Sequence, residues 1–415
     1  MKQIIQTKYL EELKLWKDVR RIKIITGVRR SGKTTILRQF IEILKKEFDI
    51  RMSQIFDYDF NNPKFLNYTY MELYDEIVGN AIQDKTNYVF LDEIQDIPEF
   101  EKCVIGLFEH RTLKFDIYIS SSNSRMFSEE LATLFTGRGK EIKILPLSFK
   151  QYYEYVNNIS ELDAFKRYMK YGGLPLIVEN WNNDKMVEDD LSMVFNDSVT
   201  KDIKFRHSIG NYTNFKNIAK YVFEHIAQYI SIHNLVSFIN ANNKTKISYN
   251  TIARYLEWMQ EALLLYKCQV YNFVEKKVLQ TTSKYYSVDT GIRNSESKFK
   301  NINSGFQLEN VIYLELKRRG YEVHVGKLRN GEIDFVAEKS KETLFIQVTE
   351  KIDWDQVTEK IDWDEKSKNY KREIGTLEVI KINEPKIVLS LFDLTQKTNT
   401  GIKVMNVIDW LLEKE

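Results

Sequence analysis

The residues with the clearest chemical potential run from Gly27 to Thr34, GVRRSGKT, and fit the pattern G-x4-G-K-[ST]. A glycine-containing loop of this kind turns its backbone N–H groups around phosphate oxygens. Lys33 is then placed to reach the β- and γ-phosphates, and the Thr34 hydroxyl to bind Mg2+. The segment predicts a site for ATP and Mg2+ made of Gly27, Val28, Arg29, Arg30, Ser31, Gly32, Lys33, Thr34 and Thr35.

The sequence around this loop supplies the elements that such a site requires. An apolar run, Ile22 to Thr26, reads as a strand that leads into the loop, and residues 34–40 read as the start of a helix. A helix that begins at the loop adds the positive end of its dipole to the phosphate site. The alternative is a chance turn between a strand and a helix.

A second pair of residues is expected beside the loop. The run NYVFLDE, Asn87 to Glu93, reads as a buried parallel strand that ends in two acids. Asp92 is predicted to hold the Mg2+ shell together with Thr34, and Glu93 to orient and deprotonate an attacking water. Alone, an apolar run followed by two acids is weak evidence, because any strand that leaves a core can end in this way.

Two further polar residues are candidates for catalysis. Asn123 follows a third strand-like run, residues 115–120, and is predicted to sense the γ-phosphate and the attacking water. Its alternative is a loop Asn that turn chemistry favours. Arg138 lies between glycines, where its guanidinium is predicted to stabilise charge on the transferred phosphoryl group, in cis or from a neighbouring subunit. Its alternative is a solvated Arg in a glycine turn.

Length and composition bound the remaining possibilities. The chain has 415 residues, enough for two to four domains, and 43% hydrophobic residues, which argues against disorder. Its formal charge of +2 does not by itself indicate a nucleic-acid or membrane partner. Cys103 and Cys268 read as buried free thiols, and no Cys/His spacing suggests zinc. Neither a secretion signal nor an apolar stretch of about 18 residues is visible, so a cytosolic protein is expected.

The order of elements predicts an α/β protein of several domains. Residues 1–146 alternate strand-like and helical segments, which is typical of a parallel sheet with helices on both faces. Residues 147–205 are mainly helical and read as a lid. Residues 206–290 contain predicted helices at 214–228, 231–240 and 248–261, with Ser248 as an N-cap, and then two strand-like runs. That order predicts a winged helix.

The winged helix raises the question of DNA. Its third helix carries Arg254 but also Glu257 and Glu261, whereas a helix that reads DNA is usually more basic. Contact with DNA and a packing or protein-partner role therefore both stay open. A basic stretch at residues 366–372 is a second candidate for contact with nucleic acid.

The last predicted domain, residues 291–415, begins with an amphipathic helix at 306–316, and strands follow at 322–325, 332–337 and 343–349. An acid from the helix and polar side chains from two neighbouring strands are typical of a metal-dependent nuclease core. The alternative is that Asp334 and Gln347 only solvate an edge of the sheet. In this domain the stretch QVTEKIDWD, residues 347–355, is repeated without change at 356–364. One strand position accepts only one register, so the first copy is expected in the sheet and the second as a surface insertion.

The segments GVRRSGKTT, YVFLDEIQ, SSSNSR, TGRGKEIKILPLSF, YGGLP, KYYSVDTGI, GFQLENVIYLELKRRGYEV, EIDFVA and IQV can be taken together. In this order they resemble the prokaryotic AAA-type ATPases that carry a C-terminal domain of unknown function 4143. The resemblance implies an AAA-like ATPase core, a winged helix and a C-terminal α/β domain similar to the PD-(D/E)xK nuclease fold. It matches Lys33 and Thr34 to the phosphate loop, Asp92 and Glu93 to the acidic strand end, and Asn123 to the first sensor; Arg138 lies in the matching GR step.

In the nuclease-like domain the resemblance places Glu309, Asp334 and Gln347 where they would face a second metal. Thr349 stands where an active nuclease of this fold has a lysine, which argues against cleavage. The leading interpretation is an ATP-hydrolysing molecular switch or motor coupled to the C-terminal modules. An ATP-gated DNA-processing nuclease and a non-hydrolysing, nucleotide-dependent regulator of DNA or a protein are the alternatives. Expected partners are ATP, DNA or an unknown protein, and further copies of the chain, but no membrane.

Overall fold

The computed structural model describes residues 4–124, 135–204, 207, 209–242, 246–273, 275, 277–300, 304–329, 331–340, 342–349, 374–380, 384–391, 396–398 and 400–413. Its contacts divide the chain into two compact units. Unit 1 consists of Met1–Leu145, Asp197–Arg206 and Glu261–Leu263, and unit 2 of Pro146–Asn196, His207–Gln260 and Leu264–Glu415. The residues expected as a lid, 147–205, are thus divided between the two units.

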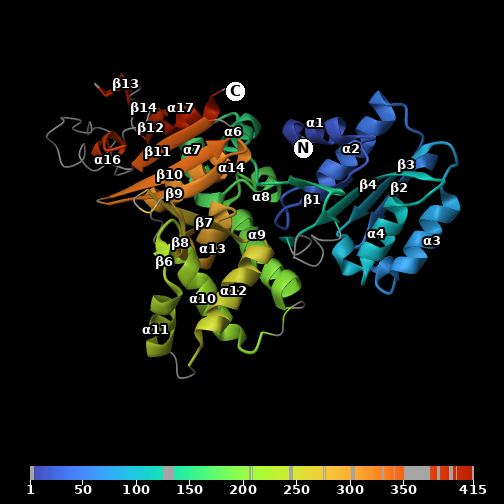
Figure 1. Ribbon diagram of the computed structural model, residues 1–415, viewed down its shortest axis with the longest axis horizontal. Helices are drawn as coiled ribbons and strands as arrows, with labels where there is room; N and C mark the ends of the chain where they lie inside the picture. The colour runs from blue at the N-terminus through green and yellow to red at the C-terminus, as the bar shows by residue number, and fades with distance from the viewer. Residues whose placement is uncertain are drawn as a thin grey trace. The chain divides into compact units, whose positions relative to one another are not determined.

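Unit 1 is built on the predicted parallel sheet. Its strands are β1 (Ile22–Thr26), β2 (Ile55–Asp59), β3 (Thr86–Asp92), β4 (Lys114–Ser121) and β5 (Gly139–Lys143). They lie in the order β2-β3-β4-β1-β5, and every pairing is parallel (Figure 1). The carboxyl ends of β1, β3 and β4 therefore meet at one edge, which brings the predicted phosphate loop, acids and Asn123 together.

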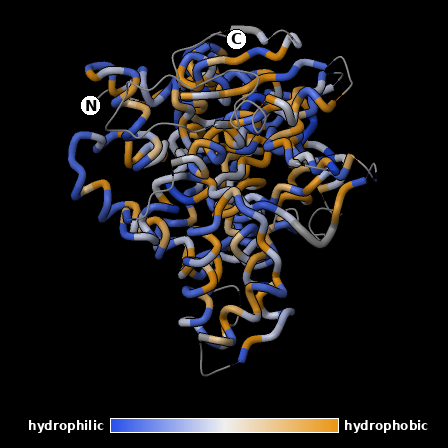
Figure 2. The backbone as a smooth tube through the Cα atoms, turned by 90° about the vertical axis from the view of Figure 1, so that its left-hand side faces the viewer, coloured by the Kyte–Doolittle hydropathy of each residue, from blue (hydrophilic) through white to orange (hydrophobic). Residues whose placement is uncertain are grey.

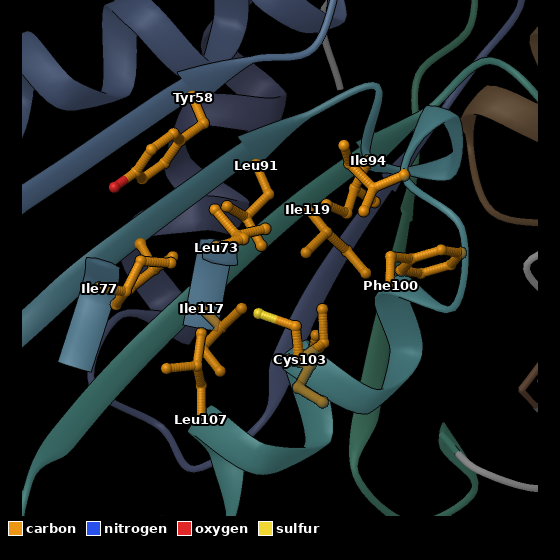
Figure 3. Close-up of a cluster of buried hydrophobic side chains, with 14 of the residues drawn as sticks. Tyr58, Leu73, Ile77, Leu91, Ile94, Phe100, Cys103, Leu107, Ile117 and Ile119 are labelled. Atoms are coloured by element: carbon orange, nitrogen blue, oxygen red, sulfur yellow. The ribbon is translucent and has the colours of Figure 1, made fainter. Parts of the chain in front are cut away.

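Helices cover both faces of this sheet because its strands are apolar on both sides. In β3, Val89 and Leu91 point into one core while Tyr88 and Phe90 point into the other, as the period of two requires. The first core packs against α3 (Tyr70–Asn80) and α4 (Phe100–Phe108), and Figure 3 shows side chains from both helices meeting those of the strands. The second packs against α1 (Thr7–Trp16) and α2 (Lys33–Glu47).

The two cysteines are buried free thiols, as expected. Figure 3 shows Cys103 of α4 with its sulfur turned into the first core, and burial raises its pKa to about 12. A thiol in this environment stays protonated and behaves as a small apolar group. No helix within the described ranges is long and apolar enough to cross a membrane.

Unit 2 contains the helices that follow the first sheet. These are α6 (Phe149–Val156), α7 (Glu161–Tyr171), α8 (Pro175–Glu179), α9 (Asp184–Asp197), α10 (Tyr212–Glu224), α11 (Ile232–Asn242) and α12 (Tyr249–Glu261). Ser248 accepts a hydrogen bond from the Thr251 N–H at 3.2 Å, so the predicted N-cap of α12 is confirmed. Figure 2 shows hydrophobic and hydrophilic residues alternating along the backbone, as expected of elements with one buried face.

The strands of unit 2 form one mixed sheet. They are β6 (Tyr229–Ile230), β7 (Leu265–Asn272), β8 (Lys277–Ser287), β9 (Glu322–Leu328), β10 (Gly331–Lys339), β11 (Glu342–Thr349), β12 (Lys386–Ser390), β13 (Gln396–Lys397) and β14 (Lys403–Asn406). The order is β13-β14-β12-β11-β10-β9-β7-β8-β6. β7 pairs in parallel with β9, so the hairpin expected as the wing continues the sheet of the C-terminal region.

The remaining helices of unit 2 are α13 (Thr290–Glu296), α14 (Ser304–Arg318), α16 (Gly375–Glu378) and α17 (Val407–Leu412). Two glycine motifs meet where α13 begins. Asp289, its N-cap, accepts from the backbone N–H groups of Gly173 and Gly291 at 2.7 and 2.8 Å. At Gly172, a Cβ atom would lie 2.0 Å from the Asp289 Oδ1 atom, and φ is +78°. Only glycine fits this approach.

Candidate functional site

The phosphate loop connects β1 to α2 in the predicted way. A Cβ atom at Gly27 would lie 2.7 Å from the Ile144 carbonyl oxygen, so this position has no space for a side chain. Gly32 caps α2 in the left-handed conformation, at φ 98°. Arg30 also has a positive φ of 65°. These angles turn the loop sharply enough to direct backbone N–H groups inward.

Lys33 begins α2 and is buried, with 4% of its surface exposed. Its ammonium donates to the Gly27 carbonyl oxygen at 3.0 Å and lies 3.1 Å from the Glu93 carboxylate. A buried ammonium requires such partners. Lys33 therefore lies inside the loop, next to the acid that was predicted to activate water.

The predicted Mg2+ residues are in direct contact. The Thr34 hydroxyl donates to the Asp92 Oδ2 atom at 2.5 Å, and Ser120 of β4 donates to Asp92 Oδ1. Asp92 is 2% exposed, and burial, together with the charge of Glu93, raises its pKa. A hydroxyl and a carboxylate at this spacing are oxygen donors of the kind that Mg2+ prefers, so the residues fit the ion.

Glu93 follows β3 in a strained left-handed conformation, at φ 55°. Its carboxylate accepts from the Ser122 N–H at 3.2 Å and from the Gln95 amide. Burial by itself raises the pKa of Glu93, but the charges of Lys33 and Arg29 outweigh it and lower the pKa to about 2. Glu93 is therefore ionised throughout the neutral range, as a group that orients water must be.

Asn123 follows the carboxyl end of β4 and is fully buried, and the N–H of its neighbour Ser122 donates to Glu93. Its Nδ2 atom donates to the main-chain oxygen of Asp202 at 3.4 Å. Asp202 is not among the residues predicted from the sequence. The π-helical segment η5 (Ser198–Lys204) carries Asp202 between buried Val199 and Ile203, and an acid on the apolar face of a helix is the signal that marks it.

Arg138 lies elsewhere. Its carbonyl accepts from the Ile22 N–H at 2.8 Å, which places it where β1 begins, whereas the phosphate loop follows the end of β1. Its guanidinium lies 2.7 Å from exposed Glu109. The strand between them spans roughly 13 Å, so Arg138 does not reach the phosphate loop of its own chain. This geometry argues against a role of Arg138 at the phosphate loop of its own subunit. A role of Arg138 in a neighbouring subunit stays a prediction.

A cavity of about 490 Å³ opens next to the acids. Arg29 of the phosphate loop and Lys201 of η5 contribute basic groups to its wall, and Gln95 contributes the amide that contacts Glu93. The remaining lining residues are Phe60, Asn61, Phe65, Leu66, Asp96 and Ile97. The cavity therefore touches the phosphate loop through Arg29 and the segment after Glu93 through Gln95 and Asp96.

The second predicted site, in unit 2, is a buried ionic cluster. The Lys284 ammonium of β8 lies 3.0 Å from the Glu309 carboxylate of α14 and 2.5 Å from that of Glu332. Burial by itself lowers the pKa of Lys284, but Glu309 and the two acids of β10 outweigh burial and raise it. The cluster therefore has an ammonium of its own at its centre.

The other members of this predicted site are also in place. Asp334 accepts from the Val348 N–H at 2.7 Å, and burial, together with Glu309, raises its pKa well above the usual range. Gln347 is buried on β11, and its Oε1 atom has no hydrogen-bond partner. No group of three or more His, Cys, Asp or Glu side chains is arranged to hold a metal in the described part of the chain. Residues 356–364 and 366–372 lie outside the described residues.

Comparison with protein families gives two matches. Residues 19–153 match the model of an AAA domain, and residues 162–303 match a domain of unknown function, DUF8612. The resemblance to proteins with the domain of unknown function 4143 was therefore wrong in this part, because the matching family is DUF8612.

Two proteins of other organisms are similar over most of their length. An uncharacterized protein of Haemophilus influenzae is 32% identical over 99% of each chain. An uncharacterized protein of Methanocaldococcus jannaschii, MJ1544, is 31% identical over 88% of this chain and 82% of its own. Among solved structures, the Walker-type ATPase paby2304 of Pyrococcus abyssi covers 71% of this chain and 96% of its own, with 14% identity and a TM-score of 0.47.

Proposed function

We propose that this chain, which belongs to one family with the two uncharacterized relatives and contains an AAA domain at residues 19–153, binds ATP with Mg2+ and hydrolyses ATP as a molecular switch or motor. The single observation that supports this proposal best is the set of contacts at the carboxyl ends of β1, β3 and β4. Thr34 at the start of α2 lies within hydrogen-bond distance of Asp92 at the end of β3, and Lys33 lies 3.1 Å from Glu93. When bound, ATP would supply the phosphoryl group, and Mg2+ would supply positive charge beside Thr34 and Asp92.

In this proposal each residue has one role. Lys33 neutralises the β- and γ-phosphates, and Thr34 with Asp92 holds Mg2+. Glu93 orients and deprotonates the attacking water, and Asn123 positions that water. The state of the site is passed to the elements of unit 2, which act on DNA or on a protein partner, and further copies of the chain form the working assembly.

Two variants test the proposal. Lys33→Ala is expected to lose ATP binding, because the phosphate charge loses its fixed counter-charge. Glu93→Gln is expected to keep ATP while turnover falls by about two orders of magnitude or more. ATP binding by calorimetry and phosphate release measure the two effects. Release by Glu93→Gln at the unsubstituted rate would remove Glu93 from its role, and a chain that does not bind ATP would overturn the proposal.

A second candidate function is an ATP-gated, DNA-processing nuclease. One observation favours it: Glu309 and Asp334 share a buried cluster with Lys284, so an ammonium lies beside the acids although Thr349 replaces the expected lysine. In a nuclease-like centre this ammonium would neutralise the scissile phosphate. The same contacts also fit a closed ionic cluster that binds no metal. A DNA cleavage assay distinguishes the two.

A further inference from the structure

The π-helical segment η5 brings one acid into the phosphate site. Asp202 is 1% exposed and lies with Ser198, Val199 and Ile203 on the buried face of that segment. π-helical turns are rare and recur at functional sites, because the extra residue per turn redirects side chains. An isolated buried carboxylate is unfavourable unless charged or polar partners compensate for the lost water.

Asp202 has such partners, and they include Arg29 of the phosphate loop and Ser122 after β4. Arg29 of the phosphate loop binds it in a bidentate manner, with its Nε atom 2.6 Å from Oδ2 and its Nη2 atom 2.7 Å from Oδ1. The Ser122 hydroxyl donates to Oδ1 at 3.0 Å. Two parallel N–H···O bonds fix the plane and the position of a guanidinium.

The main chain of Asp202 makes the fourth contact. Its carbonyl oxygen accepts from the Asn123 side-chain amide at 3.4 Å, and Ser122 and Asn123 are neighbours at the end of β4. One residue of η5 therefore connects the phosphate loop with the predicted sensor. The positive charge of Arg29 also lowers the pKa of Glu93, the acid expected to orient water. The position of the Arg29 guanidinium therefore affects that acid directly.

We propose that Asp202 is a positioning residue, which holds Arg29 and Asn123 where they act on the γ-phosphate and on the water oriented by Glu93. This proposal rests on the proposed ATPase function. Without the Asp202 carboxylate, the Arg29 side chain has several rotamers available, and Glu93 and Asp96 are acids left to attract it. The chain reaches η5 directly from α9, so the segment is also the covalent continuation of a helix of unit 2.

The test is Asp202→Asn, which keeps the volume and removes the charge. We expect kcat for ATP to fall about a hundred-fold, and ATP affinity to fall about ten-fold relative to ADP affinity, while the circular dichroism spectrum stays that of the folded parent. Asp189→Asn, the same change on the exposed face of α9, is the matched control and should leave all three measurements unchanged. Arg29→Gln should reproduce the loss, and the double variant should be no worse than either single one, because one interaction is removed.

Asp202→Asn with unchanged kcat and an unchanged ratio of ATP to ADP affinity overturns the proposal. So does a loss of activity that only follows a loss of folded protein, which circular dichroism would report. Failure of the ATPase proposal looks different, because the unsubstituted chain would then release no phosphate. In that case the ratio of ATP to ADP affinity decides the role of Asp202 alone. If Asp202→Asn does not fold, Arg29→Gln gives the same two readouts.

Discussion

Lys33 and Glu93 neutralise each other at 3.1 Å, and this pair sets the chemistry of the nucleotide site. When the Lys33 ammonium turns toward phosphate oxygens, it stabilises the charge of the Glu93 carboxylate less. The pKa of Glu93, about 2 in this arrangement, then rises toward that of a better general base. The same contact that keeps Glu93 ionised thus makes its basicity sensitive to where the Lys33 ammonium lies.

The ionic cluster of unit 2 leads to a prediction about single side chains. Lys284 lies between Glu309 and Glu332, so the place where a divalent cation would bind already holds an ammonium. We therefore expect the unsubstituted chain not to nick supercoiled plasmid DNA in Mg2+ or Mn2+, with or without ATP. Agarose electrophoresis of the plasmid measures this.

Asp334→Asn is the control for that measurement, and Lys284→Gln is its companion. Nicking by the parent that disappears in both variants would contradict the expectation and establish the nuclease candidate, with Lys284 as its ammonium. Nicking that survives in both would belong to a contaminant.

Residues recognised from local spacing were predictable, whereas their distant partners were not. Lys33 and Thr34 follow from a pattern within one loop, and Asp92 and Glu93 from the end of a strand. Asp202 lies 173 positions from Arg29, and Lys284 lies 25 positions from Glu309, so no local pattern links either pair. Only the tertiary fold decides which acid a buried cation contacts.

At the scale of elements, the contact between the end of α7 and the start of α13 carries a prediction. Gly172 has a φ of +78°, and a Cβ atom there would lie 2.0 Å from Asp289. Gly172→Ala is expected to lower the free energy of unfolding by about 2 kcal/mol or more, because the new methyl group displaces the cap of α13. Urea denaturation followed by circular dichroism measures the change.

Gly210→Ala is the matched control in the same unit, since a Cβ atom at Gly210 meets nothing within 4 Å. It should change stability by a few tenths of a kcal/mol. Equal midpoints for the two variants would show that the Gly172 turn adapts and that the contact with Asp289 is not needed.

Individual elements were predictable, but the way in which they join was not. The strands at 22–26, 115–120 and 343–349 are visible as apolar runs, and the structure has them as β1, β4 and β11. The β7–β8 hairpin was also visible, yet its parallel pairing with β9 was not, because backbone hydrogen bonds between strands leave little trace in the side chains.

At the scale of the whole molecule, Arg138 predicts an assembly. It lies at the opposite end of β1 from the phosphate loop, so it can act on a γ-phosphate only from another copy. Arg138→Ala and Lys33→Ala are each expected to be inactive alone. Mixed together they should regain part of the turnover, because some interfaces then combine an intact Arg138 with an intact Lys33.

Glu109→Ala is the control for this mixing experiment. It removes the 2.7 Å partner of Arg138 and leaves the guanidinium in place, so turnover should persist. Mixtures that stay inactive, together with a monomer at every concentration tested by light scattering, would reduce Arg138 to a surface residue of a glycine turn.

The division of unit 1 among Met1–Leu145, Asp197–Arg206 and Glu261–Leu263 has a consequence for biosynthesis. A ribosome that has released residue 145 has delivered every strand of the parallel sheet, but not the η5 segment that binds Arg29. The ion pair between Arg29 and Asp202 must therefore wait during translation until Asp202 leaves the exit tunnel, and until then the unit lacks this contact. Expression of residues 1–146 alone would make that waiting state permanent.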